Sequence, residues 1–276
     1  MTSRLPLGET LHQLINGLGE GPLLVHSDLV RAGRVVASTD RRVILEAHLQ
    51  VIREAAQGSP IWMPSFNYDF TSAKRFDTRT APSQVGALTE FFRTSYAAWR
   101  TAVPIFSFSG IGDVPEHRST GRIDPFGDDS AFAALKRRDG LVLFYGAPFS
   151  CVTMLHHAER LAGGPLYRYD KIFVGEVILQ SGEARAVELL YHVRPKGKSI
   201  DYDFDRLTKD LTAAGILRSW ESGGARLQAV SAHRLVDFWG EKLDKDPLYL
   251  LDQSSRGWVE LELNRLGRRF EITDFE

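Results

Sequence analysis

LLVHSD, at residues 23–28, is a continuous apolar run that breaks into a polar turn. This pattern predicts a buried strand that ends in a loop. Apolar residues then recur every three or four positions from 43 to 52, behind Thr39 or Asp40 as the capping residue. Another short apolar run, at 61–63, predicts the next strand. Strand, helix and strand in this order predict a βαβ unit, whose crossover favours parallel pairing in a sheet covered on both faces.

The rest of the chain extends this unit. LVLFY at 141–145 predicts a second fully buried strand, which leads through Gly-Ala-Pro into a helical stretch at 151–162. The segments 169–180 and 187–193 are β-rich and flank Ser-Gly-Glu, which predicts an antiparallel hairpin. We further expect a strand at 105–108, a second hairpin formed by 258–263 and 268–272, and helices at 7–18, 83–93, 129–138 and 201–218.

These elements together predict an α/β fold with a mixed, largely parallel central sheet that is covered by helices and carries added β-hairpins. No repeat, heptad run or composition break marks a linker, so we expect a single domain over residues 1–276. Two loops, at 64–82 and 109–127, are longer than most connections in compact domains. Long loops of this kind often carry function.

Composition excludes several classes of protein. A chain of 276 residues can bury an ample core, and its single Cys permits no internal disulfide framework, which predicts a reducing compartment. No apolar run reaches the roughly 18 residues of a membrane span, and the N-terminus lacks the apolar core of a signal peptide. The formal net charge of -1 provides no basic field for nucleic acid. We therefore expect a cytoplasmic protein that binds neither membranes nor nucleic acid.

The strongest chemical signal is the pair His156 and Glu159, three residues apart at the start of a helix that follows a buried strand. Helical spacing places both side chains on one face, where they can touch. A carboxylate on one imidazole nitrogen fixes the tautomer and raises the basicity of the other nitrogen, as a general base requires. An ion pair on a helix surface is the alternative explanation.

Two further features bear on chemistry. His26, Ser27 and Asp28 follow a buried strand, where ligands commonly bind in α/β sheets, although a simple helix cap explains them as well. No dinucleotide or P-loop phosphate motif is present, so neither type of nucleotide site is predicted. Cys151, five residues before His156, is either a covalent acyl carrier or an inert small hydrophobic residue.

The run at 167–171, Tyr-Arg-Tyr-Asp-Lys, combines aromatic and basic side chains that suit an anionic or sugar-like ligand. Alternation at the start of a strand explains the same run equally well. His156 and His157 lack the spacing of a His-Glu-x-x-His zinc motif, and the chain has no Cys cluster. We therefore predict no metal site.

Six segments, in this order along the chain, resemble the aminoglycoside 3-N-acetyltransferase family, also called the antibiotic N-acetyltransferase family. The resemblance implies the fold of that family, acetyl-coenzyme A as co-substrate, and direct acyl transfer to a substrate amine. The segments are LLVHSDLVRAG at 23–33, MPSFNYDF at 63–70, PSQVGALTEFFR at 82–93, PIFSFSGIG at 104–112, FGDDSAF at 126–132 and FYGAPFSCVTMLHHAE at 144–159.

The resemblance also implies roles for single residues. His156 and Glu159 match the catalytic His and Glu of the family. The residues expected at the coenzyme A site are His26, Ser27, Asp28, Ser107 and Thr153. The residues expected to bind the acceptor substrate are Tyr68, Asp69, Tyr167, Arg168 and Lys171.

Two features depart from the drug-modifying members of the family. Those members typically carry a His before the Pro of the fourth motif, and here that position is Val103. YRYDKIFVGEV at 167–177 and YHVRP at 191–195 resemble instead a branch found among surface-polysaccharide and other biosynthetic genes. The predicted loops mix acidic and basic side chains, which suits a less charged or anionic amino sugar at least as well as a polycationic antibiotic.

The leading prediction is an acyl-coenzyme A-dependent N-acyltransferase that acts on an amino sugar or aminocyclitol. One alternative is a ping-pong acyltransferase that uses Cys151. Another is a non-catalytic module that binds coenzyme A or a glycan. The hairpin edges fit either a homodimer interface or strands covered within one chain, and the sequence leaves both open.

Overall fold

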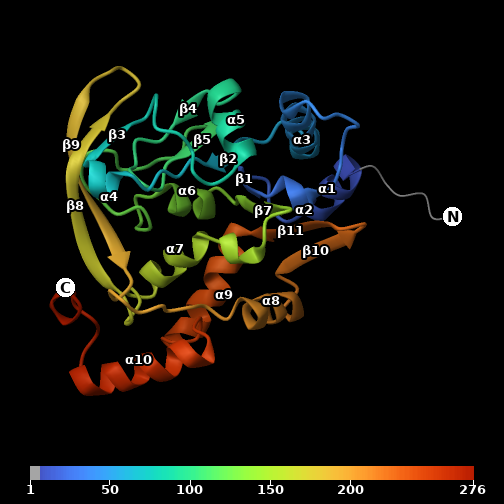
Figure 1. Cartoon of the computed structure of the whole chain (residues 1–276). Helices are drawn as coiled ribbons and strands as arrows, with labels where there is room; N and C mark the ends of the chain where they lie inside the picture. The colour runs from blue at the N-terminus through green and yellow to red at the C-terminus, as the bar shows by residue number, and fades with distance from the viewer. Residues whose placement is uncertain (1–6) are drawn as a thin grey trace.

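The computed structural model describes residues 7–276 and contains two sheets (Figure 1). A seven-stranded sheet forms the centre of the molecule. Its strands, in sheet order, are β10 (Leu217–Ser222), β11 (Ala225–Ser231), β7 (Leu141–Tyr145), β1 (Leu23–Ser27), β2 (Ile61–Pro64), β5 (Phe108–Ile111) and β4 (Trp99–Arg100). The predicted mixed sheet covered by helices is confirmed.

The βαβ unit predicted from the first apolar run is present. β1 pairs in parallel with β2, and α3 (Arg41–Ala56) connects them. Asp40 caps α3, because its carboxylate accepts hydrogen bonds from the backbone N–H groups of Arg42 and Val43 at 2.7 and 3.1 Å. β7 pairs in parallel with the other side of β1. The three strands β2, β1 and β7 are therefore the parallel centre of the sheet.

Parallel pairing is less extensive than the sequence predicted. The pairs β10–β11, β11–β7, β2–β5 and β4–β5 are all antiparallel. β10 and β11 are joined by the tight turn at Gly223-Gly224, which permits only antiparallel pairing. Parallel neighbours need a long crossover connection, such as the one through α3 that joins β1 to β2.

Alternate residues of the central strands pack on opposite faces of the sheet. Leu23 and Val25 of β1 pack with α1 (Leu7–Ile15), α3 and α5 (Ala87–Ser95). Leu24, between them, belongs to the core of the other face, which includes α6 (Ala131–Arg137), α7 (Met154–Leu161) and α9 (Ala232–Lys245). This two-sided burial explains why the strands are apolar without interruption.

The second sheet contains β3 (Arg75–Asp77), β8 (Tyr169–Ile178), β9 (Ala184–Val193) and β6 (Gly121–Ile123), in that order. β8 and β9 form the antiparallel hairpin predicted from the sequence. In Figure 1 this hairpin lies at the left of the molecule, at the opposite end from α1 and α3. The remaining elements are α2 (Leu29–Ala32), α4 (Phe70–Ala73), η1 (Phe149–Cys151), α8 (Phe204–Ala213), α10 (Gln253–Leu266) and η2 (Ile272–Asp274).

The second predicted hairpin, at 258–263 and 268–272, is wrong. The first of these segments lies inside α10, which Asp252 caps by accepting a 2.6 Å hydrogen bond from the backbone N–H of Ser255. The sequence Trp-Val-Glu-Leu-Glu-Leu alternates as a strand would, but α10 buries only one narrow side. Val259 is fully buried, whereas Leu261 is 70% exposed. Strand-like alternation therefore misled the prediction at a mostly exposed helix.

Other boundaries also differ from the prediction, and for two of them the backbone gives the reason. The strand expected at 105–108 begins only at Phe108, because Ile105 has a φ of +64° and the backbone turns before it. The helix expected at 201–218 ends at Ala213, and Gly215, with a φ of +65°, leads directly into β10.

The turns that follow β1 and β7 lie against each other at Gly146. The backbone N–H of Asp28 donates to the carbonyl of Tyr145 at 2.9 Å, and Ser27 forms a β-bridge with Gly146. Gly146 has a φ of +73°, and a Cβ atom there would lie 2.0 Å from the backbone oxygen of Asp28. Only glycine fits this position, and the contact brings the turns after the two strands together.

No helix within residues 7–276 is long and apolar enough to cross a membrane.

We predict that Gly146→Ala lowers the free energy of unfolding by about 3 kcal/mol or more in urea titrations, since it combines a strained φ with a backbone clash. Gly58→Ala is the matched control, because Gly58 has a φ of +89° but no atom within 4 Å of the added Cβ. The control substitution should lower the free energy of unfolding by only about 1 kcal/mol. Equal losses for the two variants would show that close packing at Gly146 contributes nothing.

Candidate functional site

A cavity of about 300 Å³ opens where β1, β2 and β7 end. The carboxyl ends of these parallel strands meet at one edge of the sheet, which is where α/β proteins commonly bind ligands. The cavity is lined by His26, Ser27, Pro64, Phe66, Tyr68, Val85, Ala147, Ser150, Cys151, Val152, Thr153, Leu155, His156, Arg194, Tyr202 and Phe204.

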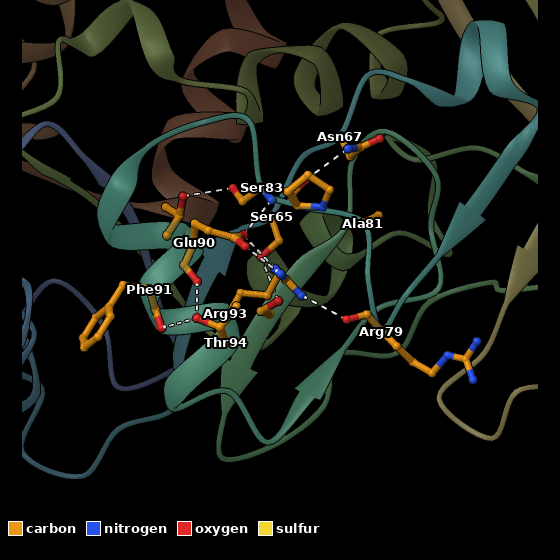
Figure 2. Close-up of polar contacts among 12 residues, drawn as sticks. Ser65, Asn67, Arg79, Ala81, Ser83, Glu90, Phe91, Arg93 and Thr94 are labelled. Atoms are coloured by element: carbon orange, nitrogen blue, oxygen red, sulfur yellow. Dashed lines mark hydrogen bonds and ion pairs between the residues drawn. The ribbon is translucent and has the colours of Figure 1, made fainter. Parts of the chain in front are cut away.

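The loop that supplies Tyr68 to this wall is anchored to α5 (Figure 2). The Glu90 carboxylate accepts a 2.7 Å hydrogen bond from the backbone N–H of Ser83 and forms a 2.7 Å ion pair with Arg93. Arg93 also donates to the backbone carbonyl of Arg79 at 3.3 Å. These contacts tie the C-terminal part of the loop to the helix and hold this wall in place.

A buried arginine, Arg100, also anchors this loop through hydrogen bonds. Arg100 donates to the backbone carbonyl of Ser65 at 2.7 Å, to the backbone carbonyl of Ala81, and to the hydroxyl of Ser107 at 3.1 Å. Burial lowers the pKa of Arg100 to about 9, which leaves it charged at neutral pH. Its donors thus pair with backbone carbonyls at both ends of the loop.

The second wall of the cavity carries the predicted pair on α7. His156 Nδ1 lies 2.8 Å from Glu159 Oε2. The exposed fraction of the His156 side chain is 18%, whereas that of Glu159 is 1%. The carboxylate therefore lies behind the imidazole, and the imidazole lines the cavity. This arrangement differs from the exposed ion pair that was the alternative.

Glu159 is the centre of a buried network. Its Oε1 accepts hydrogen bonds from the hydroxyls of Tyr167 at 2.6 Å and Tyr202 at 2.9 Å. Arg168 donates to the Tyr202 hydroxyl at 2.9 Å. His192 Nε2 lies 3.6 Å from Glu159 Oε2. Both carboxylate oxygens therefore have donors, as a buried carboxylate requires.

The network sets the charge of both members of the pair. Burial raises the pKa of the Glu159 carboxyl, but the interactions with His156 and His192 and the charge of Arg168 outweigh it and lower the pKa well below its ordinary value. Burial lowers the pKa of His156, and the hydrogen bond to Glu159 opposes only part of this shift. At neutral pH, Glu159 is ionised and His156 is neutral.

The ionised carboxylate determines the tautomer of His156. An ionised Glu159 can only accept, so His156 Nδ1 must carry the proton of their hydrogen bond. His156 Nε2 then keeps its lone pair. The cavity wall thus includes an imidazole with an unprotonated nitrogen that can accept a proton.

The end of β1 supplies two polar side chains without partners within the described chain. His26 Nε2 and Ser27 Oγ are both buried and make no hydrogen bond to residues 7–276. The His26 ring stacks on Phe144 with a centroid separation of 5.4 Å, and burial lowers its pKa to about 4. Unsatisfied polar atoms at a cavity wall are available for hydrogen bonds to a ligand.

Several predicted site residues meet at the cavity, and others do not. Tyr167 and Arg168 lie behind the wall, where they contact Glu159 and Tyr202. The cavity wall contains the predicted residues His26, Ser27, Tyr68, Thr153 and His156.

The other predicted binding residues have different partners. Asp28 caps α2 by accepting from the backbone N–H of Val30 at 3.0 Å. Ser107 is fully buried under the loop and donates to the carbonyl of Ser65 at 2.7 Å. Asp69 accepts from Gln84 at 2.9 Å, and Lys171 pairs with Glu276. The structure does not bring these four side chains to the cavity.

Val103, where drug-modifying relatives were expected to carry a His, is 5% exposed and packs in the apolar core.

Sequence reasoning missed Tyr202, His192 and Arg194. Tyr202 lies in the polar sequence Asp-Tyr-Asp, which gave no chemical signal. His192 and Arg194 lie within YHVRP, which was noted only as a family-like segment. Their position opposite α7 depends on the β8–β9 hairpin and could not be read from local spacing.

The residues with metal-like spacing in the described chain are His156, Glu159 and His192, whose ligand atoms lie within 4.8 Å of one another. Glu159 already accepts from His156, Tyr167 and Tyr202. A cation would have to displace these donors, so the donor set fits a hydrogen-bonded network better than a metal centre.

Cys151 lines the cavity, with an exposed thiol. Partial burial and the nearby charge of Asp28 raise the pKa of the thiol above its ordinary value. Because the thiolate is the nucleophilic form, this environment does not activate Cys151.

Solved structures share this fold. AAC-IIIb, solved as a binary complex with CoASH, aligns with a TM-score of 0.67 and 23% identity, covering 86% of this chain and 96% of its own. A mutant of aminoglycoside acetyltransferase AAC(3)-IVa, in complex with apramycin, aligns with a TM-score of 0.63 and 20% identity over 90% of this chain and 96% of its own.

Comparisons of the sequence identify the family, whereas the solved structures show only the fold. Aminoglycoside N(3)-acetyltransferase VII of Streptomyces paromomycinus is 29% identical over 252 residues, which cover 80% of this chain and 85% of that protein. Aminoglycoside N(3)-acetyltransferase IX of Micromonospora chalcea is 27% identical over 80% of this chain and 87% of that protein. The family model described as aminoglycoside 3-N-acetyltransferase matches residues 24–244.

Fold and sequence together define an N-acetyltransferase. The chain belongs to the aminoglycoside 3-N-acetyltransferase family, and the resemblance seen in its motifs is confirmed.

The depressed pKa of His26 predicts a pH-dependent stability. The unfolded chain binds a proton at the ordinary value of 6.5, whereas the folded protein binds it only at about 4. The stability contributed by neutral His26 is therefore complete above pH 6.5 and is lost as the pH falls toward 4. The free energy of unfolding, measured by urea titration, should fall between neutral pH and about pH 5 in both proteins. The fall should be about 2 kcal/mol larger for the wild type than for His26→Gln. Parallel pH profiles would mean that His26 is not buried in its neutral form.

Proposed function

We propose that this protein transfers the acetyl group of acetyl-coenzyme A directly to an amine of an amino sugar or aminocyclitol, with His156 as the general base. The observation that carries this proposal is the hydrogen bond from His156 Nδ1 to the ionised, buried Glu159. Relatives named as aminoglycoside acetyltransferases and a structure of the same fold with CoASH support the two substrates.

The features of the cavity fit an acyl-transfer reaction. His156 Nε2 accepts a proton from the amine as its nitrogen bonds to the acyl carbon, and Glu159 stabilises the imidazolium that results. The Thr153 hydroxyl lines the cavity and makes only a long 3.3 Å hydrogen bond to the carbonyl of Cys151, so it is a candidate donor to the acyl oxygen, on which negative charge develops. Acetyl-coenzyme A supplies the acyl group and a thiolate leaving group.

The residues that would hold the co-substrate are those of the β1 turn. Ser27 Oγ and His26 Nε2 are unsatisfied within the described chain, and both residues line the cavity. The pantetheine arm of coenzyme A carries amide groups that can pair with such side chains. The donor set at this wall therefore fits the group that the family uses.

We predict that His156→Ala lowers kcat by about two to four decades in an assay of thiol release, because the proton acceptor is removed. Binding of acetyl-coenzyme A, measured by calorimetric titration, should stay nearly unchanged. Cys151→Ser is the matched control on the same wall and should keep its turnover.

Each other outcome has a distinct meaning. Unchanged turnover in His156→Ala would exclude the general-base assignment. Loss of turnover in Cys151→Ser would favour the covalent scheme. Binding of acetyl-coenzyme A without thiol release for any amine would favour a non-catalytic module.

A further inference from the structure

The charge of the cavity that holds His156 bears on the kind of acceptor that it can bind. No Asp or Glu side chain is among its lining residues. Its two histidines, His26 and His156, are neutral at neutral pH because burial lowers the pKa of both. Arg194 is the lining residue that is charged.

Carboxylates near the cavity are already engaged. Glu159 accepts from two tyrosine hydroxyls and from His156. Asp28 caps α2, and Asp69 accepts from Gln84. None of these carboxylates belongs to a residue that lines the cavity. A polycationic acceptor would therefore find no carboxylate among the lining residues and would be repelled by Arg194.

Arg194 follows the last residue of β9 and is exposed. Arg160, on α7, differs from it because it pairs with Asp124 at 2.9 Å and with Asp170 at 3.0 Å. Arg194 makes no hydrogen bond or ion pair with any of residues 7–276, although it lines the cavity. A guanidinium without a partner, placed at a cavity wall, can form paired hydrogen bonds with a phosphate or carboxylate.

The position of Arg194 favours the acceptor as the source of that anion. Arg194 and His156 line the same cavity, and the charge of Arg194 adds to burial in lowering the pKa of the imidazole. The general base must contact the reacting amine, so a group beside it is near the acceptor. In coenzyme A, the phosphates lie at the far end of the pantetheine arm from the thioester. An anion near the reacting centre therefore belongs to the acceptor.

We propose that Arg194 is a specificity residue that binds a phosphate or carboxylate on the acceptor, and that the substrate is an anionic amino sugar. This inference rests on the function proposed above. The proposed acceptor is anionic, whereas the names of the relatives refer to aminoglycosides, which are polycations.

The test compares four amines that differ in charge. Glucosamine 6-phosphate and muramic acid carry a phosphate and a carboxylate, glucosamine carries no anionic group, and gentamicin is a polycation. We expect kcat/KM for at least one of the anionic amines to exceed that for glucosamine by about tenfold or more, and gentamicin to be the poorest. Arg194→Gln should abolish this preference through KM. Arg185→Gln, at the far turn of the hairpin and paired with Glu183, should keep it.

Three results would overturn the inference: gentamicin as the best acceptor, no advantage of either anionic amine over glucosamine, or a higher KM for acetyl-coenzyme A alone in Arg194→Gln. The last would assign Arg194 to the phosphates of coenzyme A. If no amine releases thiol, the proposed function fails. Calorimetric binding of glucosamine 6-phosphate then tests separately whether Arg194 forms an anion site. Binding that is lost in Arg194→Gln would support the anion site, and absence of binding to wild type would exclude it.

Discussion

The structure depends on one buried carboxylate. Glu159 is 2% exposed and ionised, so the fold must surround it with donors. Those donors come from three parts of the chain: His156 from the same helix, Tyr167 from the segment before β8, and Tyr202 from the segment after β9. The second sheet and α7 are therefore joined through the same group that orients the imidazole.

The C-terminal part of the chain supports this network. The Tyr167 ring packs in a cluster with Leu248, Val259 and Phe270, from α10 and the segments on either side of it. These three residues lie beyond residue 244, where the family match ends. Figure 1 shows α10 and the C-terminus on the same side of the molecule as the lower end of the β8–β9 hairpin. Packing outside the matched region thus holds one of the donors to Glu159.

Sequence reasoning succeeded where the signal was local. The uninterrupted apolar strands, the Asp40 cap and the three-residue spacing of His156 and Glu159 each depend on a few neighbouring residues. It failed where packing decides. The alternating residues around Val259 form an exposed helix instead of a strand, and Ser107 is held beneath a loop by Arg100 instead of lining the cavity. The role of Arg194 could not be predicted from its neighbours in the sequence, because it depends on the cavity that Arg194 lines in the folded chain.

Burial keeps His156 neutral, and its hydrogen bond to Glu159 holds the proton on Nδ1 and leaves the lone pair on Nε2. Nitrogen-15 NMR of labelled histidines, with His156 assigned through His156→Gln, measures this directly. We expect an Nδ1-protonated, neutral imidazole at neutral pH, whose pKa lies below the ordinary value of 6.5. An Nε2-protonated ring, or an imidazolium that persists at neutral pH, would contradict it.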